Sequence, residues 1–505
     1  MRSPTLMLQG TMSSVGKSLL VAAFCRLFKA AGLRVAPFKA QNMALNSYAT
    51  HDGFEVGRAQ AMQAAAAGIE VTAAMNPVLI KPEADSFAQI IVMGKPWARL
   101  PAHAYYQKRN ELWGIVTNAL DSLRETYDLV VIEGAGSPVE LNLRQNDIVN
   151  MAVANYADSP VLLVGDIDRG GIFAQLLGTL MLLEEKERVR GFLVNKFRGD
   201  RNLFTEGINI LEEKGKIPVL GVIPFIRNLR LPDEDSVALD DLQPQPNLNK
   251  ANLELAVIRL PHLSNFDDFD ALRAESNVFV SFVESAKELD SADLIILPGT
   301  KTTIADLRFL RERGLASRII ALAQEGRPIL GICGGYQILG KMIFDPNEVE
   351  SAEKEVQGLG LLPVSTTFVA EKQTLRSQGK VFAKQGLFAN AQNLPVAGYE
   401  IHSGYTNFVG AGQPLLQVTR RGETSVNESD GAIAPNGWIA GTYFHGLFEN
   451  DELRHQLLQN VANLRGKVWE SKSTTFDREE SYTYLAETVR QHLDWEKVWQ
   501  LVHGF

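Results

Sequence analysis

The glycine- and serine-rich stretch from Gly10 to Ser18 (GTMSSVGKS) constrains the fold of this chain more than any other feature. It follows a short apolar run at Thr5–Leu8, and the residues after it, Lys17–Ala31, place apolar side chains at helical spacing. Gly32 is positioned to end that helix, and Val35–Phe38 is the next apolar run. A strand, a helix and a second strand in this order predict a βαβ unit and hence a parallel sheet.

The same stretch has the residues of a phosphate-binding loop. Glycine lets the backbone turn its N–H groups onto phosphate oxygens. We expect Gly10, Thr11 and Gly16 to contact ATP, Lys17 to reach its β- and γ-phosphates, and the Ser18 hydroxyl to bind Mg²⁺. The two glycines are separated by five residues instead of the usual four, a spacing similar to that of dethiobiotin synthetase and the MinD-like ATPases.

Two further candidates follow predicted strands of the same sheet. Glu133 opens the sequence Glu-Gly-Ala-Gly directly after the strand Leu129–Ile132, where a second Mg²⁺ ligand is expected. Asn195 follows the strand Phe192–Val194 and is a candidate for contacting adenine, although asparagine is also common there as a turn residue.

The distribution of apolar runs predicts two α/β domains. Continuous apolar strands are typical of a parallel sheet covered on both faces. The polar stretch 240–252 contains two prolines and predicts a linker. A second α/β pattern follows it, and a helical pattern begins at Asp451. We therefore predict an N-terminal P-loop domain at 1–239, a linker at 240–252, a domain at 253–450 and a helical extension at 451–505. The further predicted strands are Val161–Val164, Val219–Ile223, Leu255–Leu260, Leu294–Leu297 and Ile329–Ile332.

The second domain contains a nucleophile elbow with sulfur in place of oxygen. Cys333 stands in Gly-Ile-Cys-Gly-Gly between the strand Ile329–Ile332 and a predicted helix at Tyr336–Met342. The flanking glycines allow the sharp turn that exposes the thiol. The backbone N–H groups of Gly334 and of Gly299, after the strand Leu294–Leu297, are candidates for an oxyanion hole.

A cysteine nucleophile needs a base, and two histidines are candidates. His445 follows a strand-like run and would take the thiol proton, then protonate ammonia as it leaves. His402 is the competing candidate and could instead line the substrate site. Cys25, on the first predicted helix, is expected to be a buried structural thiol.

Composition excludes several classes of partner. The formal net charge of −9, without a basic run, argues against nucleic acid. Two cysteines in 505 residues fit a reducing compartment. The run at Thr5–Leu8 is too short for a signal peptide, and no apolar stretch approaches the ~20 residues that span a bilayer. We therefore expect a cytoplasmic protein without a membrane partner.

Several segments together resemble the cobyric acid synthase family of glutamine amidotransferases in cobalamin biosynthesis. The resemblance covers nearly the whole chain, and the joint order of the segments is specific. They are 10–18, 38–46, 132–138, 142–151, 166–171, 263–270, 299–304 and 331–336.

The resemblance implies a fold and a reaction. It implies a dethiobiotin-synthetase-like parallel-sheet domain followed by a class I amidotransferase-like α/β domain. It implies amidation of peripheral carboxylates of adenosylcobyrinic acid a,c-diamide, with ATP, Mg²⁺ and either L-glutamine or ammonia. Lys39, Asn42 and Asp147 match family motifs and are carried over as substrate or catalytic candidates. Ordinary class I glutaminases have His-x-Glu, but Leu447 stands at the position of that Glu, so nothing in this motif orients His445.

Other functions remain open at this level. The chain also fits an a,c-diamide synthase or a ligase for cell-wall precursors. A MinD- or ParA-like ATPase switch would explain the phosphate loop but not the cysteine elbow. A catalytically inactive binding module is a third alternative. If Cys333→Ala keeps both ammonia-dependent and glutamine-dependent synthesis, Cys333 is structural.

Overall fold

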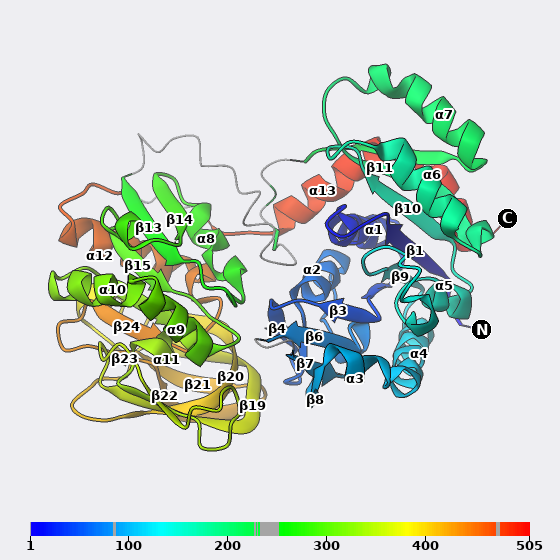
Figure 1. The fold of residues 1–505 in the computed structure, drawn as a ribbon. Coiled ribbons are helices and arrows are strands. Elements are labelled where there is room, and N and C mark those ends of the chain that lie inside the picture. The colour runs from blue at the N-terminus through cyan, green and yellow to red at the C-terminus, as the bar shows by residue number, and fades with distance from the viewer. Residues whose placement is uncertain are drawn as a thin grey trace.

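The computed structural model describes residues 2–83, 87–226, 229, 231–232, 252–470 and 475–504. Two α/β units, one from each half of the chain, lie side by side (Figure 1). The predicted linker 240–252 lies outside the described residues apart from Asn252. Among the described helices, none has the length and apolar character that crossing a bilayer requires.

The N-terminal half contains a parallel sheet with strand order β12-β11-β10-β1-β9-β2. A smaller sheet, β3-β6-β7-β8, and a two-stranded sheet, β4-β5, are inserted after β2. The strands are β1 (Thr5–Gly10), β2 (Val35–Phe38), β3 (Gln41–Met43), β4 (Ser47–Ala49), β5 (Glu55–Gly57), β6 (Val78–Pro82), β7 (Phe87–Val92), β8 (Lys95–Pro101), β9 (Leu129–Glu133), β10 (Val161–Asp166), β11 (Val189–Phe197) and β12 (Val219–Pro224).

Helices cover both faces of this parallel sheet (Figure 1), which explains why β1, β9 and β10 are buried along their whole length. The predicted βαβ unit is confirmed, with strands and helix ending within two residues of their predicted limits. The helices of this half are α1 (Lys17–Ala30), α2 (Arg58–Ala67), α3 (Ala102–Tyr106), α4 (Arg109–Thr126), α5 (Met151–Ala157), α6 (Ile172–Leu182) and α7 (Thr205–Gly215).

The C-terminal half contains a second sheet, β14-β13-β15-β16-β24-β23, in which all neighbours are parallel except β23 and β24. A mainly antiparallel sheet, β18-β17-β19-β21-β22 with β20 on β19, packs beside it. The strands are β13 (Leu253–Ile258), β14 (Val278–Val283), β15 (Leu294–Leu297), β16 (Ile329–Ile332), β17 (Met342–Phe344), β18 (Glu355–Gln357), β19 (Val364–Val381), β20 (Pro395–Phe408), β21 (Leu416–Arg421), β22 (Thr424–Asp430), β23 (Ala432–Ile433) and β24 (Ile439–Thr442).

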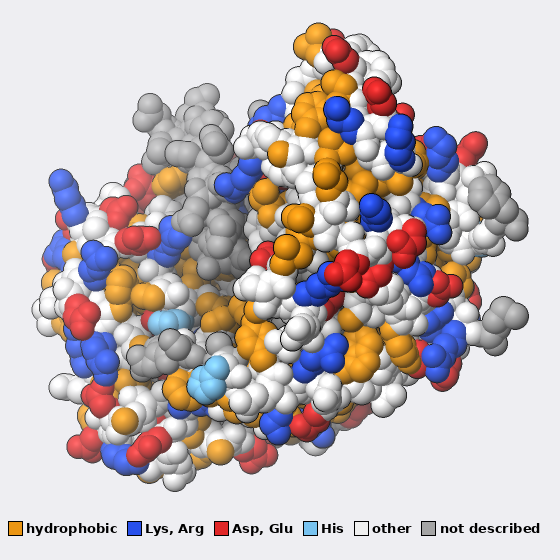
Figure 2. Space-filling view, turned by 45° about the vertical axis from the view of Figure 1, so that its right-hand side comes forward, with side chains coloured by type: hydrophobic (Ala, Val, Ile, Leu, Met, Phe, Trp, Pro, Cys, Tyr) orange, Lys and Arg blue, Asp and Glu red, His pale blue; other side chains and the backbone are white. Residues whose placement is uncertain are grey.

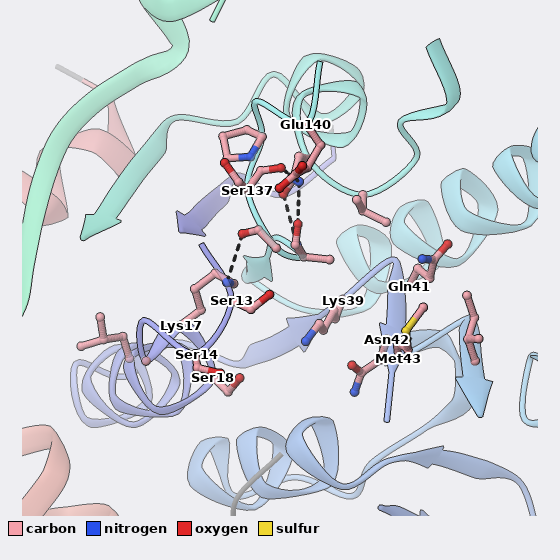
Figure 3. Close-up of a pocket in the computed structure, with 18 of the residues that line it drawn as sticks. Ser13, Ser14, Lys17, Ser18, Lys39, Gln41, Asn42, Met43, Ser137 and Glu140 are labelled. Atoms are coloured by element: carbon pink, nitrogen blue, oxygen red, sulfur yellow. Dashed lines mark hydrogen bonds between the residues drawn. The ribbon is translucent and has the colours of Figure 1, made fainter. Parts of the chain in front are cut away.

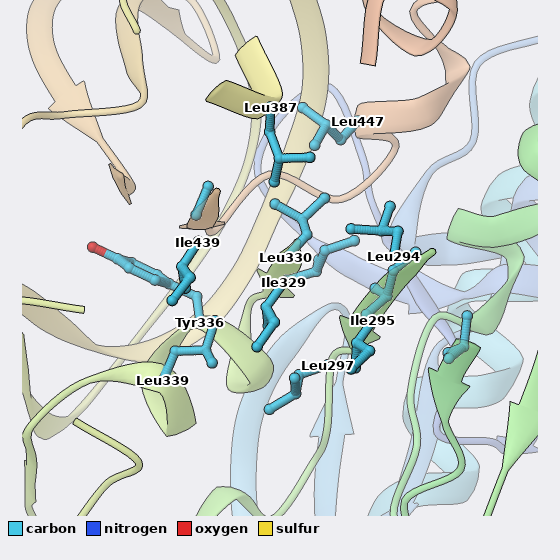
Figure 4. Packing of buried hydrophobic residues seen from close by; sticks show 14 of the residues in the cluster. Leu294, Ile295, Leu297, Ile329, Leu330, Tyr336, Leu339, Leu387, Ile439 and Leu447 are labelled. Atoms are coloured by element: carbon cyan, nitrogen blue, oxygen red, sulfur yellow. The ribbon is translucent and has the colours of Figure 1, made fainter. Parts of the chain in front are cut away.

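Buried aliphatic side chains hold the second sheet against its helices. Leu294 and Ile295 of β15 pack with Ile329 and Leu330 of β16 in one cluster (Figure 4). Burial of this apolar surface is the main force that fixes the sheet. The helices of this half are α8 (Asp270–Arg273), α9 (Thr303–Glu312), α10 (Leu315–Gln324), α11 (Gly334–Leu339), α12 (Asp451–Leu464), α13 (Glu479–Gln491) and α14 (Trp495–His503).

Two elements differ from the sequence prediction. The helix predicted at Tyr336–Met342 is α11, Gly334–Leu339, because Gly340 leaves the helical conformation and Met342 pairs with Ser365 of β19. The residues after Asp451 divide between two cores: α12 packs in the C-terminal half, whereas α13 and α14 pack against α1 and the N-terminal sheet. The end of the chain therefore joins the two halves a second time.

Two candidate active sites

The phosphate-loop candidate has the backbone geometry that its glycines predict. Gly16 has φ +96°, a left-handed conformation, at the start of α1. A Cβ atom at Gly16 would lie 2.3 Å from Asn195 Nδ2, so a larger residue would also collide. The Asn195 amide donates to Val15 O at 2.8 Å, which places this predicted adenine contact against the loop itself. The Thr11 hydroxyl donates to Gln175 Oε1 at 3.2 Å.

Lys17 lies across the loop and faces a large cavity. Its ammonium donates to Met12 O at 3.1 Å and to Gly136 O at 3.2 Å. In Figure 3, Lys17 and Lys39 point into the same space, from α1 and from the end of β2. Two ammonium groups facing one space suit a polyanion such as a triphosphate.

Glu133 is the centre of a buried polar cluster beside the loop. Its Oε1 accepts from the Ser18 hydroxyl at 2.9 Å and from Lys39 Nζ at 2.8 Å. Its Oε2 accepts from Gln63 Nε2 at 2.5 Å, a partner that the sequence motifs do not indicate. Hydroxyl and carboxylate oxygens are the ligands that Mg²⁺ prefers, so the Ser18 and Glu133 pair fits this ion.

The large cavity extends from the phosphate loop to the surface and has a volume of about 2380 Å³. Asn42 and Asp147 both line it. The Asn42 amide donates to Gln60 Oε1 at 3.0 Å. The Asp147 carboxylate accepts three backbone N–H groups, two from its own loop and one from the start of α5, at 2.8 to 3.0 Å. In this structure Asp147 therefore orders the loop that forms one wall of the cavity.

The surface around the N-terminal half is chemically mixed. Figure 2 shows apolar side chains interspersed with Lys, Arg, Asp and Glu side chains over this half. The exposed apolar residues that also line the cavity include Met43, Leu141 and Leu143. The cavity wall therefore presents both apolar and charged side chains.

Cys333 occupies a strained turn between β16 and α11. Its φ is +51° and ψ −110°, an unusual conformation for a residue with a side chain. A Cβ at Gly335 would lie 2.0 Å from Leu297 O, and one at Gly331 would lie 2.7 Å from Gly335, so the flanking glycines permit the turn. The sharp strand-to-helix elbow predicted for Cys333 is present.

His445 lies against Cys333 and is oriented by Asp268. Its Nδ1 is 2.7 Å from Asp268 Oδ2, and Asp268 Oδ1 accepts the Gly446 N–H at 2.7 Å. Burial lowers the pKa of His445, but the charge of Asp268 and contacts with Asp268 and Cys333 outweigh burial and raise this pKa to about 10. Cysteine, histidine and aspartate thus form a connected triad. Asp268 was not singled out from the sequence, although it lies in one of the family segments.

The other glutaminase candidates surround this triad. A Cβ at Gly299 would lie 2.9 Å from His445 Cε1, and one at Gly334 would lie 2.5 Å from Thr300 Cγ2. Both predicted oxyanion glycines therefore lie beside the triad. His402 lines the small pocket at Cys333, where its Nδ1 is 3.0 Å from Gly404 O and its ring stacks on Tyr443.

The inserted sheet of the N-terminal half lies between the two sites. On β6, Ile80 lines the large cavity and the next residue, Lys81, lines the small pocket at Cys333. Successive side chains of a strand point to opposite faces, so the sheet separates the two spaces. Strand β4 contacts β19 and β20 across the boundary between the halves (Figure 1).

The chain is similar to known proteins along its length. Residues 6–239 match the CobQ/CobB/MinD/ParA nucleotide binding domain, and residues 254–453 match the CobB/CobQ-like glutamine amidotransferase domain. The chain is 50% identical to a cobyric acid synthase of Dehalococcoides mccartyi, over 99% of this chain and 98% of the relative. It is 53% identical to that of Chloroflexus aggregans, over 92% of each chain.

These similarities agree with the geometry of the two sites. A third relative, the cobyric acid synthase of Pelotomaculum thermopropionicum, is 48% identical over 98% of this chain and 96% of its own length. The amidotransferase domain carries the Cys333 triad and the nucleotide-binding domain carries the phosphate loop. The chain is a glutamine-dependent ligase and belongs to the cobyric acid synthase family.

Proposed function

We propose that the chain amidates the b, d, e and g carboxylates of adenosylcobyrinic acid a,c-diamide to give adenosylcobyric acid. ATP activates each carboxylate, and glutamine supplies the nitrogen. The observation that carries this proposal is the presence, in one chain of this family, of a phosphate loop on a large cavity and a Cys-His-Asp triad across a shared boundary.

Glutamine is cleaved at Cys333. His445 takes the proton of the Cys333 thiol, the thiolate sulfur attacks the side-chain amide carbon, and the N–H groups of Gly299 and Gly334 stabilise the oxyanion. His445 donates its proton to the departing nitrogen, so the C–N bond breaks and ammonia leaves a thioester on Cys333. Water then hydrolyses the thioester to glutamate and regenerates the thiol. Asp268 keeps the imidazole in the orientation that these transfers need.

The acceptor is activated at the phosphate loop. A corrinoid carboxylate attacks the γ-phosphorus of ATP, the bond to the β-phosphate oxygen breaks, and an acyl phosphate and ADP form. Lys17 and Lys39 stabilise the charge on the phosphates. Ser18 and Glu133 would hold Mg²⁺, which supplies further neutralisation of phosphate charge. Ammonia attacks the acyl carbon and inorganic phosphate departs, leaving the amide.

Three residues of the cavity position either the acceptor or the loops that form the cavity wall. Asn42 and Asp147 line the cavity beside Lys39, so their roles are positioning of the corrinoid and of the loop that faces it. Asn195 fixes the phosphate loop through Val15 O beside the nucleotide. Because the inserted sheet separates the two sites, ammonia must pass this sheet within the protein to escape protonation by solvent.

The test of the substrate is mass spectrometry of the products formed from defined corrinoids. Cobyrinic acid and its a,c-diamide are offered separately with ATP and glutamine, and each replacement of OH by NH₂ changes the mass. We expect successive amidation of the a,c-diamide. Amidation of cobyrinic acid alone would contradict the proposed substrate.

The division of labour is tested with two variants. Cys333→Ala is expected to abolish glutamine use and to retain synthesis from ammonia. Lys17→Ala is expected to abolish synthesis from either nitrogen source. If Cys333→Ala leaves glutamine-dependent synthesis intact, Cys333 is not the nucleophile.

A further inference from the structure

The small pocket at Cys333 is built by both halves of the chain. Its volume is about 50 Å³, far smaller than the cavity at the phosphate loop. Ser47 and Lys81 enter it from the N-terminal half, and Glu350 and Lys372 line it together with Cys333 from the C-terminal half. Charged side chains from both halves of the chain therefore surround the same pocket as the Cys333 thiol.

Two buried lysines give the pocket a cationic wall. Lys81 Nζ lies 2.7 Å from Glu55 Oε1, and Lys372 Nζ lies 2.5 Å from Glu55 Oε2. Lys81, Lys372 and Glu55 expose 4%, 8% and 0% of their side chains, so solvent screens this cluster little. Two lysine amines share the single Glu55 carboxylate, so this wall holds one more basic than acidic side chain.

The Glu350 carboxylate also lines the pocket. Its Oε2 accepts the N–H of Thr303 at 2.8 Å, and the Thr303 hydroxyl donates to Gln337 Oε1 at 2.9 Å. Lys301 also lines the pocket, and its ammonium lies 2.7 Å from Glu83 Oε1. Glu350 is therefore fixed in place by the start of α9, while the nearby cation is paired with another carboxylate.

We propose that this pocket binds the zwitterionic head of glutamine, with Lys372 and Lys81 receiving the α-carboxylate and Glu350 receiving the α-ammonium. The inference rests on the proposed role of Cys333, because the side-chain amide must reach that sulfur. It adds that the P-loop half supplies Lys81, so the glutamine site is complete only when the two halves are docked.

The protonation behaviour of the pocket agrees with a zwitterionic ligand. Burial lowers the pKa of Lys372 to about 7, although Glu55 opposes this shift. Burial raises the pKa of Glu350 to about 7, although Lys301 opposes it. A carboxylate beside Lys372 and an ammonium beside Glu350 would favour the charged form of each residue. One amino acid would provide both charges.

The test compares glutamine with analogues that lack one charge. 4-Aminobutanamide lacks the α-carboxylate, and glutaramic acid lacks the α-amino group. Lys372→Met and Lys81→Met are each expected to raise KM for glutamine about 10- to 100-fold, the effect of losing a charge-assisted hydrogen bond. They should leave cleavage of 4-aminobutanamide nearly unchanged. Glu350→Gln should show the matching pattern, with weakened glutamine binding and unchanged cleavage of glutaramic acid.

Controls separate recognition from folding and from the proposed chemistry. Synthesis from ammonia should persist in all three variants, and Lys372→Arg should recover part of the glutamine affinity. Lys341→Met changes an exposed lysine of the same half and should leave KM unchanged. If a variant raises KM equally for glutamine and for the analogue that lacks the corresponding charge, the head-group assignment is overturned. Glutamine use that survives Cys333→Ala would instead overturn the role of Cys333 on which the assignment rests.

Discussion

Asp268 Oδ2 lies 2.7 Å from Nδ1 of His445, and the two residues are 177 positions apart in the chain. Asp268 is not part of the sequence motif that contains the histidine. It lies in the 3₁₀ turn Phe266–Phe269, which follows β13. Ordinary class I glutaminases have a Glu carboxylate two residues after the histidine, where this chain has Leu447. The absence of that Glu beside His445 therefore does not leave the imidazole without a carboxylate partner.

Replacement of Asp268 by asparagine should impair glutamine use selectively. Asparagine keeps the shape of the side chain but removes the negative charge that stabilises protonated His445. We expect kcat for glutamine cleavage to fall by roughly 10²-fold or more, within the range of general acid–base effects. Ammonia-dependent synthesis, measured by corrinoid mass spectrometry, should change little. A proportional loss of both activities would indicate a structural role for Asp268.

The raised pKa of His445 also predicts how stability depends on pH. The folded-state pKa is about 10, above the ordinary value of 6.5, so the folded protein binds the proton more tightly. This contribution is fully present below pH 6.5 and is lost as pH rises to about 10. Urea unfolding followed by tryptophan fluorescence should show it, with a size on the order of a few kcal/mol.

His445→Gln isolates this contribution, because other buried groups titrate in both proteins. The wild-type protein should exceed the variant in unfolding free energy most at pH 6, and the difference should shrink toward pH 10. A difference that stays constant across this range would show that His445 does not gain a proton on folding.

The two cysteines should differ in reactivity. Cys25 is fully buried in α1, and burial raises its pKa well above the ordinary range. Cys333 lines a pocket and contacts His445. We expect iodoacetamide to alkylate Cys333 alone in the native protein, and glutamine should slow the reaction. Peptide mass spectrometry locates the label. Labelling of Cys25 at a comparable rate would contradict its assignment as a structural thiol. The Cys25→Ala variant should also remain active.

Local sequence patterns predicted much of the fold, because short strands and tight turns depend mainly on residues that are neighbours in the chain. Three short apolar runs between glycines and polar residues each form a buried strand: Thr5–Leu8, Val35–Phe38 and Leu129–Ile132. The glycines around Cys333 predicted the elbow for the same reason, since only a residue without a side chain fits there. These features depend on neighbours in the chain.

Residues that depend on distant contacts were not predicted. Gln63 contacts Glu133 only because α2 packs beside the phosphate loop, and nothing in its alanine-rich surroundings indicates this. Glu55 pairs with Lys372 across 317 positions. Asp268 offered a signal, since it is one of two adjacent carboxylates shortly after a predicted strand. Choosing it as the partner of His445 required the three-dimensional structure.

Arg58 connects the two halves immediately beside the triad. Its Nη2 lies 2.7 Å from Asp267 Oδ2, with 6% and 2% of the two side chains exposed, and its guanidinium lies over the Tyr48 ring at 4.8 Å. Arg58 begins α2, whereas Asp267 precedes Asp268. The N-terminal half therefore holds the turn that orients His445.

Arg58→Met should lower both stability and glutamine use. Removing one partner of a buried ion pair costs about 3–5 kcal/mol, because the other charge stays buried. We expect kcat for glutamine cleavage to fall further than ammonia-dependent synthesis, since Asp267 adjoins the residue that positions His445. Asp267→Asn removes the charge that Arg58→Met leaves unpaired. In urea unfolding, the double variant should therefore lose less unfolding free energy than the sum of the losses in the two single variants. Additive losses would show that Arg58 and Asp267 act independently and that this contact does not support the triad.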